Sequence, residues 1–444
     1  MSALDTYKQL LAEFVAFPSI STDSAYSSEI TKTAGWLVKL LEGHGFAAET
    51  WSAPGINPVV YGRYEVSDPK AATILVYGHY DVQPADEADG WQSAPFSLAE
   101  RHNRLFGRGV VDNKGQILVH IATVAELIKS KQLAHNIIFL IEGNEETGST
   151  GLSKLLQDHH EQLISDHILI SDGEIPYRPT IEASLRGGFN LRIHYRTAKT
   201  NLHSGIYGGG IPNAAQELSQ LLGSLYDSHK RLTVPGFYDD VDAITSKQTA
   251  ATEQLFVGKD RLQEITGAQS TLHHRDYPYG IATSLLPSLE VSGVQSGYTG
   301  AGFANIIPAE AEARLNVRIV ASQRTHKVYS LLEDYIHKQT PAYVDCEVEM
   351  DMACEPIKLV IDSPIVTHTR KLLHQAYGKQ PLFAYSGGSI PIVSDFKALF
   401  GKDCLLVNLG NDDCNMHGID ENFEIGLLEK GLAFSQLFFS QPIQ

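Results

Sequence analysis

Carboxylate and histidine side chains follow several short apolar segments of this 444-residue sequence, and such side chains can bind metal ions. They are His79 and Asp81 after residues 72–77, Glu145 and Glu146 after residues 136–143, Asp172 after residues 167–170, His417 after residues 404–410, and Asp112 before a predicted helix over residues 116–128. The apolar segments have the length and composition of strands buried on both faces. Because sites in open α/β sheets form beyond the carboxyl ends of the strands, we expect these side chains to converge.

Two imidazoles among several carboxylates favour Zn²⁺ or Mn²⁺ over Mg²⁺ or Ca²⁺. The candidates outnumber the ligands of one zinc ion, whereas two ions sharing a bridging carboxylate would use them all, with water or hydroxide as the nucleophile. The adjacent Glu145 and Glu146 can divide the roles of ligand and general base. Taken singly, each motif is more often a turn, a cap or a solvated loop. Their joint occurrence, each at a predicted strand end or helix start, favours the metal site.

The composition excludes several classes of function. With 35 Lys and Arg against 52 Asp and Glu, the net charge is −17, which disfavours binding to nucleic acid or to an anionic membrane surface. No uncharged apolar run approaches the ~18 residues of a membrane span. The four cysteines form no CxxC pair, and residues 1–20 resemble an amphipathic helix more than a signal peptide. We therefore predict a cytoplasmic location.

The alternation of strands and helices predicts an α/β domain with a mixed, mostly parallel sheet flanked by helices. Residues 187–356 differ, because their predicted order β-α-β-β-α-β is that of a ferredoxin-like α+β unit. The α/β pattern then resumes. We therefore predict a catalytic domain formed by residues 1–186 and 357–444, interrupted by an inserted domain over residues 187–356.

Five motifs in fixed order carry a resemblance to a known family. They are GHYDVQPA (78–85), RGVVDNKGQ (108–116), EGNEETGSTGL (142–152), SDGE (171–174) and NLHSGIYGGGIPNA (201–214). The sequence resembles the co-catalytic zinc metallopeptidases, which include aminoacylase, carboxypeptidase G and the carnosinases. The branch of carnosinase and cytosolic non-specific dipeptidase is closest, especially in HSGIYGG and in SGGSIPI (386–392). The resemblance implies that the inserted domain is a lid and dimerisation domain.

The resemblance also implies roles for the candidate residues. The implied ligands are His79 and Asp172 on one metal ion, Glu146 and His417 on the other, and Asp112 as the bridge between them. Glu145 would be the general base and acid. Asp81 would orient the His79 imidazole through its second nitrogen. The peptide bond after the bridging aspartate is cis in the family.

In the inserted domain, the resemblance implies substrate contacts. His203 would reach the active site of the partner subunit in a homodimer and stabilise the oxyanion. Asn305 would contact the substrate, and Arg318 would clamp its terminal carboxylate together with Gly388 and Ser389. Without the resemblance, His203 would more readily be interpreted as a histidine in a turn. Arg318 would be interpreted equally well as an exposed arginine on a strand or as a substrate contact.

The predicted function is hydrolysis of short peptides by a dipeptidase with two divalent ions per subunit, Zn or Mn. One alternative is an N-acyl or N-carbamoyl amino-acid amidohydrolase on the same scaffold. Another is a non-catalytic metal- or peptide-binding protein. Tyr385 and Ser386 replace an Arg-Glu pair found in the mammalian-type dipeptidases, so the preferred substrate side chains stay open.

Overall fold

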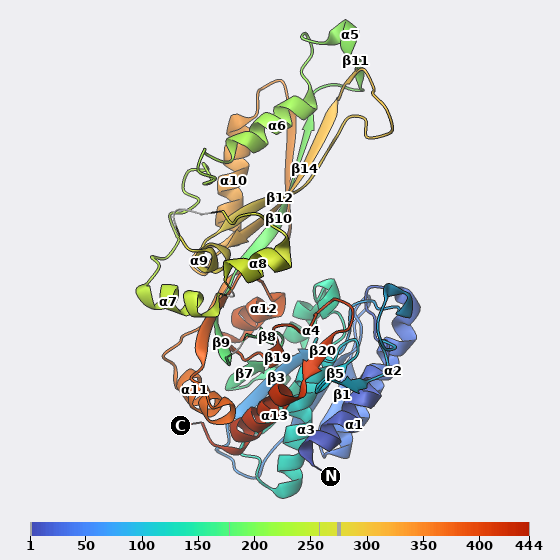
Figure 1. Cartoon of the computed structure of the whole chain (residues 1–444), viewed down its shortest axis with the longest axis vertical. Helices are drawn as coiled ribbons and strands as arrows, with labels where there is room; N and C mark the ends of the chain where they lie inside the picture. The colour runs from blue at the N-terminus through green and yellow to red at the C-terminus, as the bar shows by residue number, and fades with distance from the viewer. Residues whose placement is uncertain (1, 177, 257, 273–276, 444) are drawn as a thin grey trace. The chain divides into compact units, whose positions relative to one another are not determined.

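The computed structural model describes residues 2–176, 178–256, 258–272 and 277–443, and the chain folds into two compact units (Figure 1). The first unit comprises Met1–Ala183, Leu359–Phe383 and Pro391–Gln444. The second unit comprises Ser184–Lys358 and Ala384–Ile390. The second unit therefore interrupts the first in the sequence.

A six-stranded sheet of the order β1-β2-β6-β3-β7-β18 forms the centre of the first unit. Strands β6, β3, β7 and β18 are parallel to one another, whereas β2 pairs antiparallel with both β6 and β1. The strands of this sheet are β1 (Ala47–Trp51), β2 (Val59–Tyr64), β3 (Thr73–His79), β6 (Asn136–Glu142), β7 (His167–Ile170) and β18 (Cys404–Leu406). The predicted mixed, mostly parallel sheet is thus confirmed.

Helices cover both faces of this sheet. Consecutive side chains of a strand point to opposite faces: Tyr77 of β3 meets Phe396 of α12 edge to face, whereas Gly78 lies against Ile117 of α3. Helix α3 also packs against α1 and α13 (Figure 1). The helices of the unit are α1 (Ala3–Val15), α2 (Ser27–Gly43), α3 (Lys114–Ser130), α4 (Leu152–Asp158), α11 (Pro364–Tyr377), α12 (Pro391–Phe400) and α13 (Ile425–Ser440).

Small strands frame the loops that follow the large sheet. They are β4 (Ala99–Arg101) and β5 (Arg104–Phe106), which pair with β20 (Asn422–Glu424), and β8 (Glu174–Ile175), which pairs with β19 (Gly410–Asn411). The segment over residues 152–163 is not one continuous helix. Helix α4 ends at Asp158 because His159 leaves helical dihedral angles, and a separate 3₁₀ turn follows over His160–Leu163.

The second unit has the predicted β-α-β-β-α-β order. Its four antiparallel strands are arranged β12-β14-β10-β15. The main elements are β10 (Gly187–Arg196), α6 (Ala214–Ser224), β12 (Ser288–Ser296), β14 (Glu310–Ile319), α10 (Thr325–Gln339) and β15 (Asp345–Cys354). Shorter elements are β11 (Leu202–His203), α5 (Ser204–Tyr207), α7 (Ser246–Leu255), α8 (Lys259–Thr266), α9 (Tyr279–Ser284) and β13 (Ile306–Ile307).

The segment Ala384–Ile390 groups with the second unit, although the sequence places it in the last part of the first. Its loop is held by Arg186, whose Nε donates to Gly387 O at 3.0 Å and whose carbonyl accepts from Ser389 Oγ at 2.6 Å. A small three-stranded sheet has the order β16 (Ile357–Lys358), β9 (Thr180–Leu185) and β17 (Leu382–Ser386).

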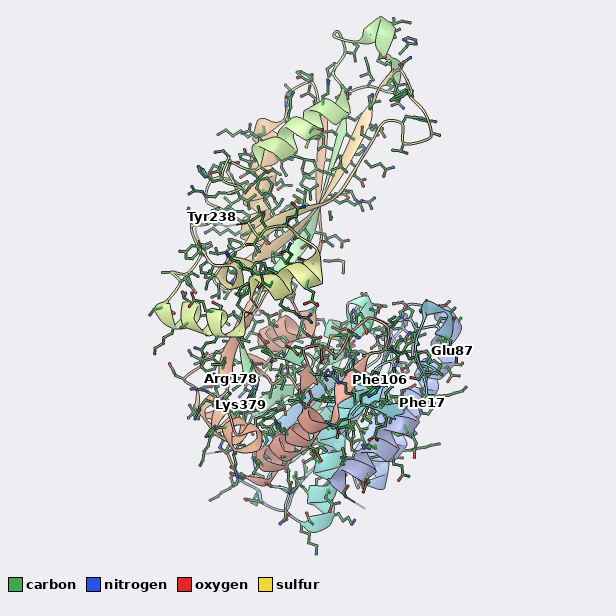
Figure 2. All side chains as sticks on the ribbon, in the orientation of Figure 1. Phe17, Glu87, Phe106, Arg178, Tyr238 and Lys379 are labelled. Atoms are coloured by element: carbon green, nitrogen blue, oxygen red, sulfur yellow. The ribbon has the colours of Figure 1, made fainter. Side chains whose placement is uncertain are left out.

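Within the first unit, just outside that small sheet, Arg178 donates to the carbonyl of Gln380, and it lies near Lys379 (Figure 2). This contact joins the segment that precedes β9 to the segment that precedes β17. In the described residues, no helix is both long enough and apolar enough to span a membrane.

Candidate metal centre

The large sheet of the first unit brings ligand-type side chains to one edge. His79 is the last residue of β3, and Asp172 lies just beyond the end of the neighbouring strand β7. Glu145 and Glu146 form a 3₁₀ turn after β6, the other neighbour of β3. Since these three strands are parallel, their carboxyl ends deliver all four side chains to the same edge.

Asp112 and His417 reach this edge from loops. Asp112 lies two residues before the start of α3, and His417 lies between β19 and β20. The peptide bond between Asp112 and Asn113 is cis, as the family resemblance implies. The buried Asn113 side chain donates from Nδ2 to Asp172 Oδ1 at 2.8 Å and to Ser171 O at 2.7 Å.

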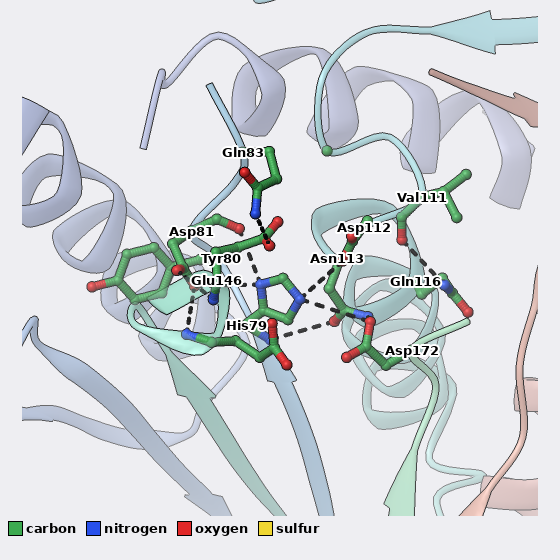
Figure 3. Close-up of polar contacts among 12 residues, drawn as sticks. His79, Tyr80, Asp81, Gln83, Val111, Asp112, Asn113, Gln116, Glu146 and Asp172 are labelled. Carbon is green, nitrogen blue, oxygen red and sulfur yellow. Dashed lines mark hydrogen bonds and ion pairs between the residues drawn. The ribbon is translucent and has the colours of Figure 1, made fainter. Parts of the chain in front are cut away.

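The first group of candidate ligands consists of His79, Asp112 and Asp172 (Figure 3). His79 Nε2 lies 3.0 Å from Asp112 Oδ1 and 3.7 Å from Asp172 Oδ1. The imidazole is fully buried, and the two carboxylates are less than one-tenth exposed. The three side chains thus direct one nitrogen and two oxygens at one point.

The second group consists of Asp112, Glu146 and His417. His417 Nε2 lies 2.8 Å from Asp112 Oδ2 and 3.4 Å from Glu146 Oε2. Asp112 therefore presents Oδ1 to the first group and Oδ2 to the second. A carboxylate in this position has the geometry of a bridge between two ions.

The donor atoms of both groups fit divalent metal ions. In each group the ligand atoms lie within 4.8 Å of one another, and imidazole with carboxylate is a donor set suited to Zn²⁺ or Mn²⁺. Glu146 Oε1 is buried without a hydrogen-bond partner among the described residues. A buried carboxylate oxygen without a partner is costly, and a cation would satisfy it.

Asp81 connects the two neighbouring strand ends. His79 Nδ1 lies 3.0 Å from the Asp81 carbonyl oxygen and 3.3 Å from Oδ1 of the same residue. The Asp81 carboxylate also accepts hydrogen bonds from the backbone nitrogens of Glu145 at 3.3 Å and Glu146 at 3.1 Å. A single buried carboxylate therefore contacts both the imidazole and the turn that bears the two glutamates.

Burial and crowding alter the acidity of the two glutamates in the metal-free protein. Burial raises the pKa of Glu145 to about 8; the charge of His79 opposes this shift, and the carboxylates of Asp172 and Asp112 add to it. Burial also raises the pKa of Glu146 to about 7, with a further contribution from Asp112. A carboxyl group with a pKa near neutrality can both accept and release a proton at physiological pH.

The pKa of Asp112, in the bridging position, shifts in the opposite direction to those of the two glutamates. Burial favours the neutral form of Asp112, but hydrogen bonds from His417 and His79 outweigh it and hold the pKa below its usual value. The hydrogen bond to Asp112 is also the main reason that the pKa of His417 rises to about 9.

Some residues of this site were not singled out from the sequence. Gln83 Nε2 donates to Glu146 Oε2 at 2.7 Å (Figure 3), and Asn113 contacts Asp172 as described above. Both residues lie inside the motifs GHYDVQPA and RGVVDNKGQ. Amide side chains within a ligand motif are the signal that could have identified them, because ligand carboxylates need hydrogen-bond donors.

The residues predicted to clamp a carboxylate lie together in the second unit. Arg318 donates from Nη1 to Ser389 Oγ at 2.9 Å and from Nε to Asn316 Oδ1 at 3.0 Å. The neighbouring Gly388 donates its backbone N–H to Ser386 Oγ at 3.0 Å. A guanidinium, a hydroxyl and a backbone amide are thus held close to one another.

His203 and Asn305 lie together in another part of the second unit. The short strands β11 and β13 pair His203 with Ile306, and the Asn305 carbonyl accepts from Ser204 N at 3.0 Å. The imidazole is exposed, and its Nδ1 accepts from Gly205 N at 3.0 Å. Its Nε2 faces no hydrogen-bond donor or acceptor that the described residues provide within bonding distance.

Proteins of known activity resemble this chain over most of its length. The Cys-Gly metallodipeptidase DUG1 of Candida albicans is 29% identical over 95% of this chain and 93% of its own length. The human Beta-Ala-His dipeptidase is 29% identical over 88% of this chain and 78% of its own length. Both names are those of dipeptidases, and the first, a metallodipeptidase, agrees with the metal-binding geometry described above.

A solved structure and a family model extend the comparison. The M20 family metallo-carboxypeptidase Sso-CP2 of Sulfolobus solfataricus matches with a TM-score of 0.84 and 27% identity, covering 99% of both chains. The model of peptidase family M20/M25/M40 matches residues 75–441, which is most of the sequence. The protein therefore belongs to peptidase family M20/M25/M40.

Proposed function

We propose that this protein is a metal-dependent dipeptidase with two divalent ions in the first unit. The observation that carries the proposal is the position of Asp112, whose two carboxylate oxygens face two separate ligand groups. One ion would be held by His79 and Asp172, and the other by Glu146 and His417. The Cys-Gly metallodipeptidases among its relatives support the same chemistry.

The proposed ligands suit both zinc and manganese, and we propose that the two ions are Zn²⁺ or Mn²⁺. When bound, such ions polarise the scissile carbonyl and lower the pKa of a water molecule. Asp81 orients the His79 ring through Nδ1, so that Nε2 remains directed at the first group. The same carboxylate fixes the backbone of the Glu145–Glu146 turn.

Glu145 is the proposed general base and acid. Its carboxyl group takes the proton of the attacking water and then delivers it to the leaving amine. Burial raises its pKa to about 8 in the metal-free protein, which agrees with a carboxyl group that can carry a proton near neutral pH. Glu146 contacts His417 and Gln83 instead, as expected of a ligand.

The proposed substrate clamp consists of Arg318, Ser389 and Gly388. Ser389 Oγ donates to Arg186 O and accepts from Arg318, so the hydroxyl holds the guanidinium in one orientation. A guanidinium matches the two oxygens of a carboxylate. This arrangement supports recognition of the terminal carboxylate of a short peptide.

We propose a homodimer because two predicted substrate contacts, Arg318 and His203, lie at opposite ends of the second unit. Arg318 of β14 pairs with Gly188 at the start of β10, whereas Glu310 pairs with Arg196 at its end. At about 3.3 Å per residue, these two ends of the strand lie roughly 26 Å apart.

His203 and Asn305 lie beyond the Glu310 end, where β11 and α5 are located (Figure 1). A dipeptide is too short to contact Arg318 and His203 of one chain, so a second copy would supply the histidine and with it stabilise the oxyanion.

We also propose a reducing, cytoplasmic environment, which the four free cysteine thiols support.

A substrate panel tests the proposed function. The metal-loaded protein is assayed on dipeptides, on their N-acetylated forms and on tetrapeptides, with Glu145→Gln as a control for contaminating peptidases. We expect the free dipeptides to be cleaved fastest, and the control variant to have lost that activity.

Either of two results of this substrate panel would contradict the dipeptidase proposal and favour an alternative. Faster cleavage of the N-acetylated substrates would favour the amidohydrolase alternative. Binding of two ions without hydrolysis of any substrate would favour a non-catalytic binding protein.

A further inference from the structure

A buried ion pair lies beside the candidate metal centre without contributing a ligand to it. Arg108 Nη1 and Glu421 Oε2 are 2.9 Å apart, and their side chains are 4% and 0% exposed. Burying two charges is expensive unless further hydrogen bonds satisfy them. Both side chains have such bonds, and these bonds lead to the segments that bear the proposed ligands.

Glu421 accepts four hydrogen bonds from one loop. Its Oε1 accepts from the backbone nitrogens of Val111 at 2.8 Å and Asp112 at 3.0 Å. Its Oε2 accepts from Gly109 N at 2.9 Å and from the Arg108 guanidinium. The carboxylate therefore fixes the main chain of the loop up to and including the proposed bridging residue.

Arg108 extends the same network to two other loops. Its Nη2 donates to the carbonyl oxygens of His417 at 3.3 Å and Gly418 at 3.0 Å, and to Pro84 O at 3.4 Å. The backbone of His417 has a φ of 60°, in the left-handed region that residues other than glycine seldom occupy. Contacts at its carbonyl therefore help to hold the loop in this conformation.

We infer that Arg108 and Glu421 are positioning residues that set the separation between Asp112 and His417, and thereby the affinity for the ion in the second group. The inference rests on the ligand assignment of the proposed function. The ion of the first group depends less on the pair, because His79 and Asp172 are held by β3, β7 and Asn113.

Titration of the metal-free protein with Zn²⁺ tests the inference. Calorimetry follows the two binding events in the wild type, Glu421→Gln, Arg108→Lys and the matched control Asp420→Asn. Asp420 is the neighbour of Glu421, but its carboxylate accepts from Arg101 and from Gln92 N, whereas Glu421 accepts from the segment that carries Asp112. Far-UV circular dichroism of each metal-free variant shows whether it is folded.

We expect the second ion to bind about 10- to 100-fold more weakly to Glu421→Gln and Arg108→Lys, as for other residues that support metal ligands. The glutamine amide has a single oxygen, so it can replace only one of the two Glu421 oxygens. The two N–H groups that the other oxygen now accepts would lose their acceptor. The lysine cannot contact Glu421 and three carbonyl groups at once. The first ion should lose less affinity than the second, and the Asp420→Asn control should keep affinities close to those of the wild type.

Equal affinities of wild type, Glu421→Gln and Arg108→Lys for the second ion would overturn the inference. If Glu421→Gln does not fold, Arg108→Lys, which retains the positive charge, decides the question alone. The variant His417→Ala shows whether a negative result concerns the positioning role of the pair or the ligand assignment of the proposed function. A variant lacking His417 that still binds two ions tightly would contradict the ligand assignment itself.

Discussion

At the scale of single residues, Glu145 and Glu146 show how neighbours in sequence separate into different roles. The Glu146 carboxylate contacts Gln83 and His417, whereas the Glu145 carboxyl is partly buried with a raised pKa. Asp81 holds the backbone of both. The assignment of base and ligand therefore depends on the direction of each side chain rather than on residue type.

Glu145→Gln should lower kcat by about 10²- to 10⁴-fold, the usual contribution of a general base. Glutamine preserves the shape of the side chain but cannot take up the proton. Metal analysis should still find both ions, since Glu145 is not a proposed ligand. Glu161→Gln, an exposed glutamate of the same unit, is the matched control and should retain full kcat. Loss of an ion from Glu145→Gln would contradict the division of roles.

His120 provides a pH-dependent prediction away from the ligands. Burial lowers its pKa to about 3, so the ring is neutral in the folded protein. Ser171 donates its hydroxyl to Val407 O, which leaves His120 Nε2–H to donate to Ser171 Oγ. Nδ1 then accepts from Ser435 Oγ.

In the unfolded chain, the same histidine gains a proton as the pH falls below about 6.5. The unfolded state is thereby favoured, and the free energy of unfolding falls as the pH decreases from 6.5 towards 3. Denaturant unfolding at pH 7 and pH 4 should show a loss on the order of 3 kcal/mol from this residue. His120→Gln should reduce the pH dependence; an unchanged dependence would show that His120 does not contribute.

At the scale of elements, the start of α3 is the point where packing is tightest around a proposed ligand. A Cβ atom at Gly115 would lie 1.7 Å from Val110 O. The glycine thus allows the helix to begin directly against the loop that carries Asp112. Its backbone N–H also donates to Gly109 O at 3.0 Å within that loop.

Gly115→Ala should therefore destabilise the protein by at least about 1–3 kcal/mol, the usual cost of overpacking. Gly35→Ala in α2 is the matched control, because its Cβ would meet no atom within 4 Å. In the control, alanine should raise stability by up to about 1 kcal/mol through its higher helix propensity. Thermal unfolding of the two variants measures the difference, and equal stabilities would refute the packing argument.

The elements also show what sequence reasoning can reach. The buried strands β3, β6 and β7 were predictable because continuous apolar runs followed by polar residues mark parallel strands. The family and the α/β fold predicted from these motifs are confirmed. The Arg108–Glu421 contact was not predictable, because more than 300 residues separate the two side chains in sequence, although Arg108 opens the motif RGVVDNKGQ.

At the scale of the whole molecule, the proposed homodimer makes each active site depend on two chains. A chain with Glu145→Gln retains His203 for its partner, while a chain with His203→Ala retains its own Glu145. In a mixed dimer, one of the two sites therefore has both residues intact. Each variant alone has none.

Mixing the two inactive variants under conditions that exchange subunits should restore activity to roughly one quarter of the wild-type level. Random exchange makes half of the dimers mixed, and each mixed dimer has one intact site of two. Steady-state assays before and after exchange measure the recovery. A chain carrying both substitutions serves as the control, and it should rescue neither single variant. No recovery in a mixture shown to contain mixed dimers would argue against His203 acting across the interface.

The central claim is that two metal ions share Asp112 and that hydrolysis requires them both. The most direct measurement is stepwise addition of Zn²⁺ or Mn²⁺ to the chelator-treated protein, with bound metal and dipeptide hydrolysis followed together. We predict no hydrolysis without metal, binding of two ions per chain, and full activity only when the second ion has bound. Full activity at one ion per chain, or hydrolysis that survives complete removal of metal, would contradict the claim.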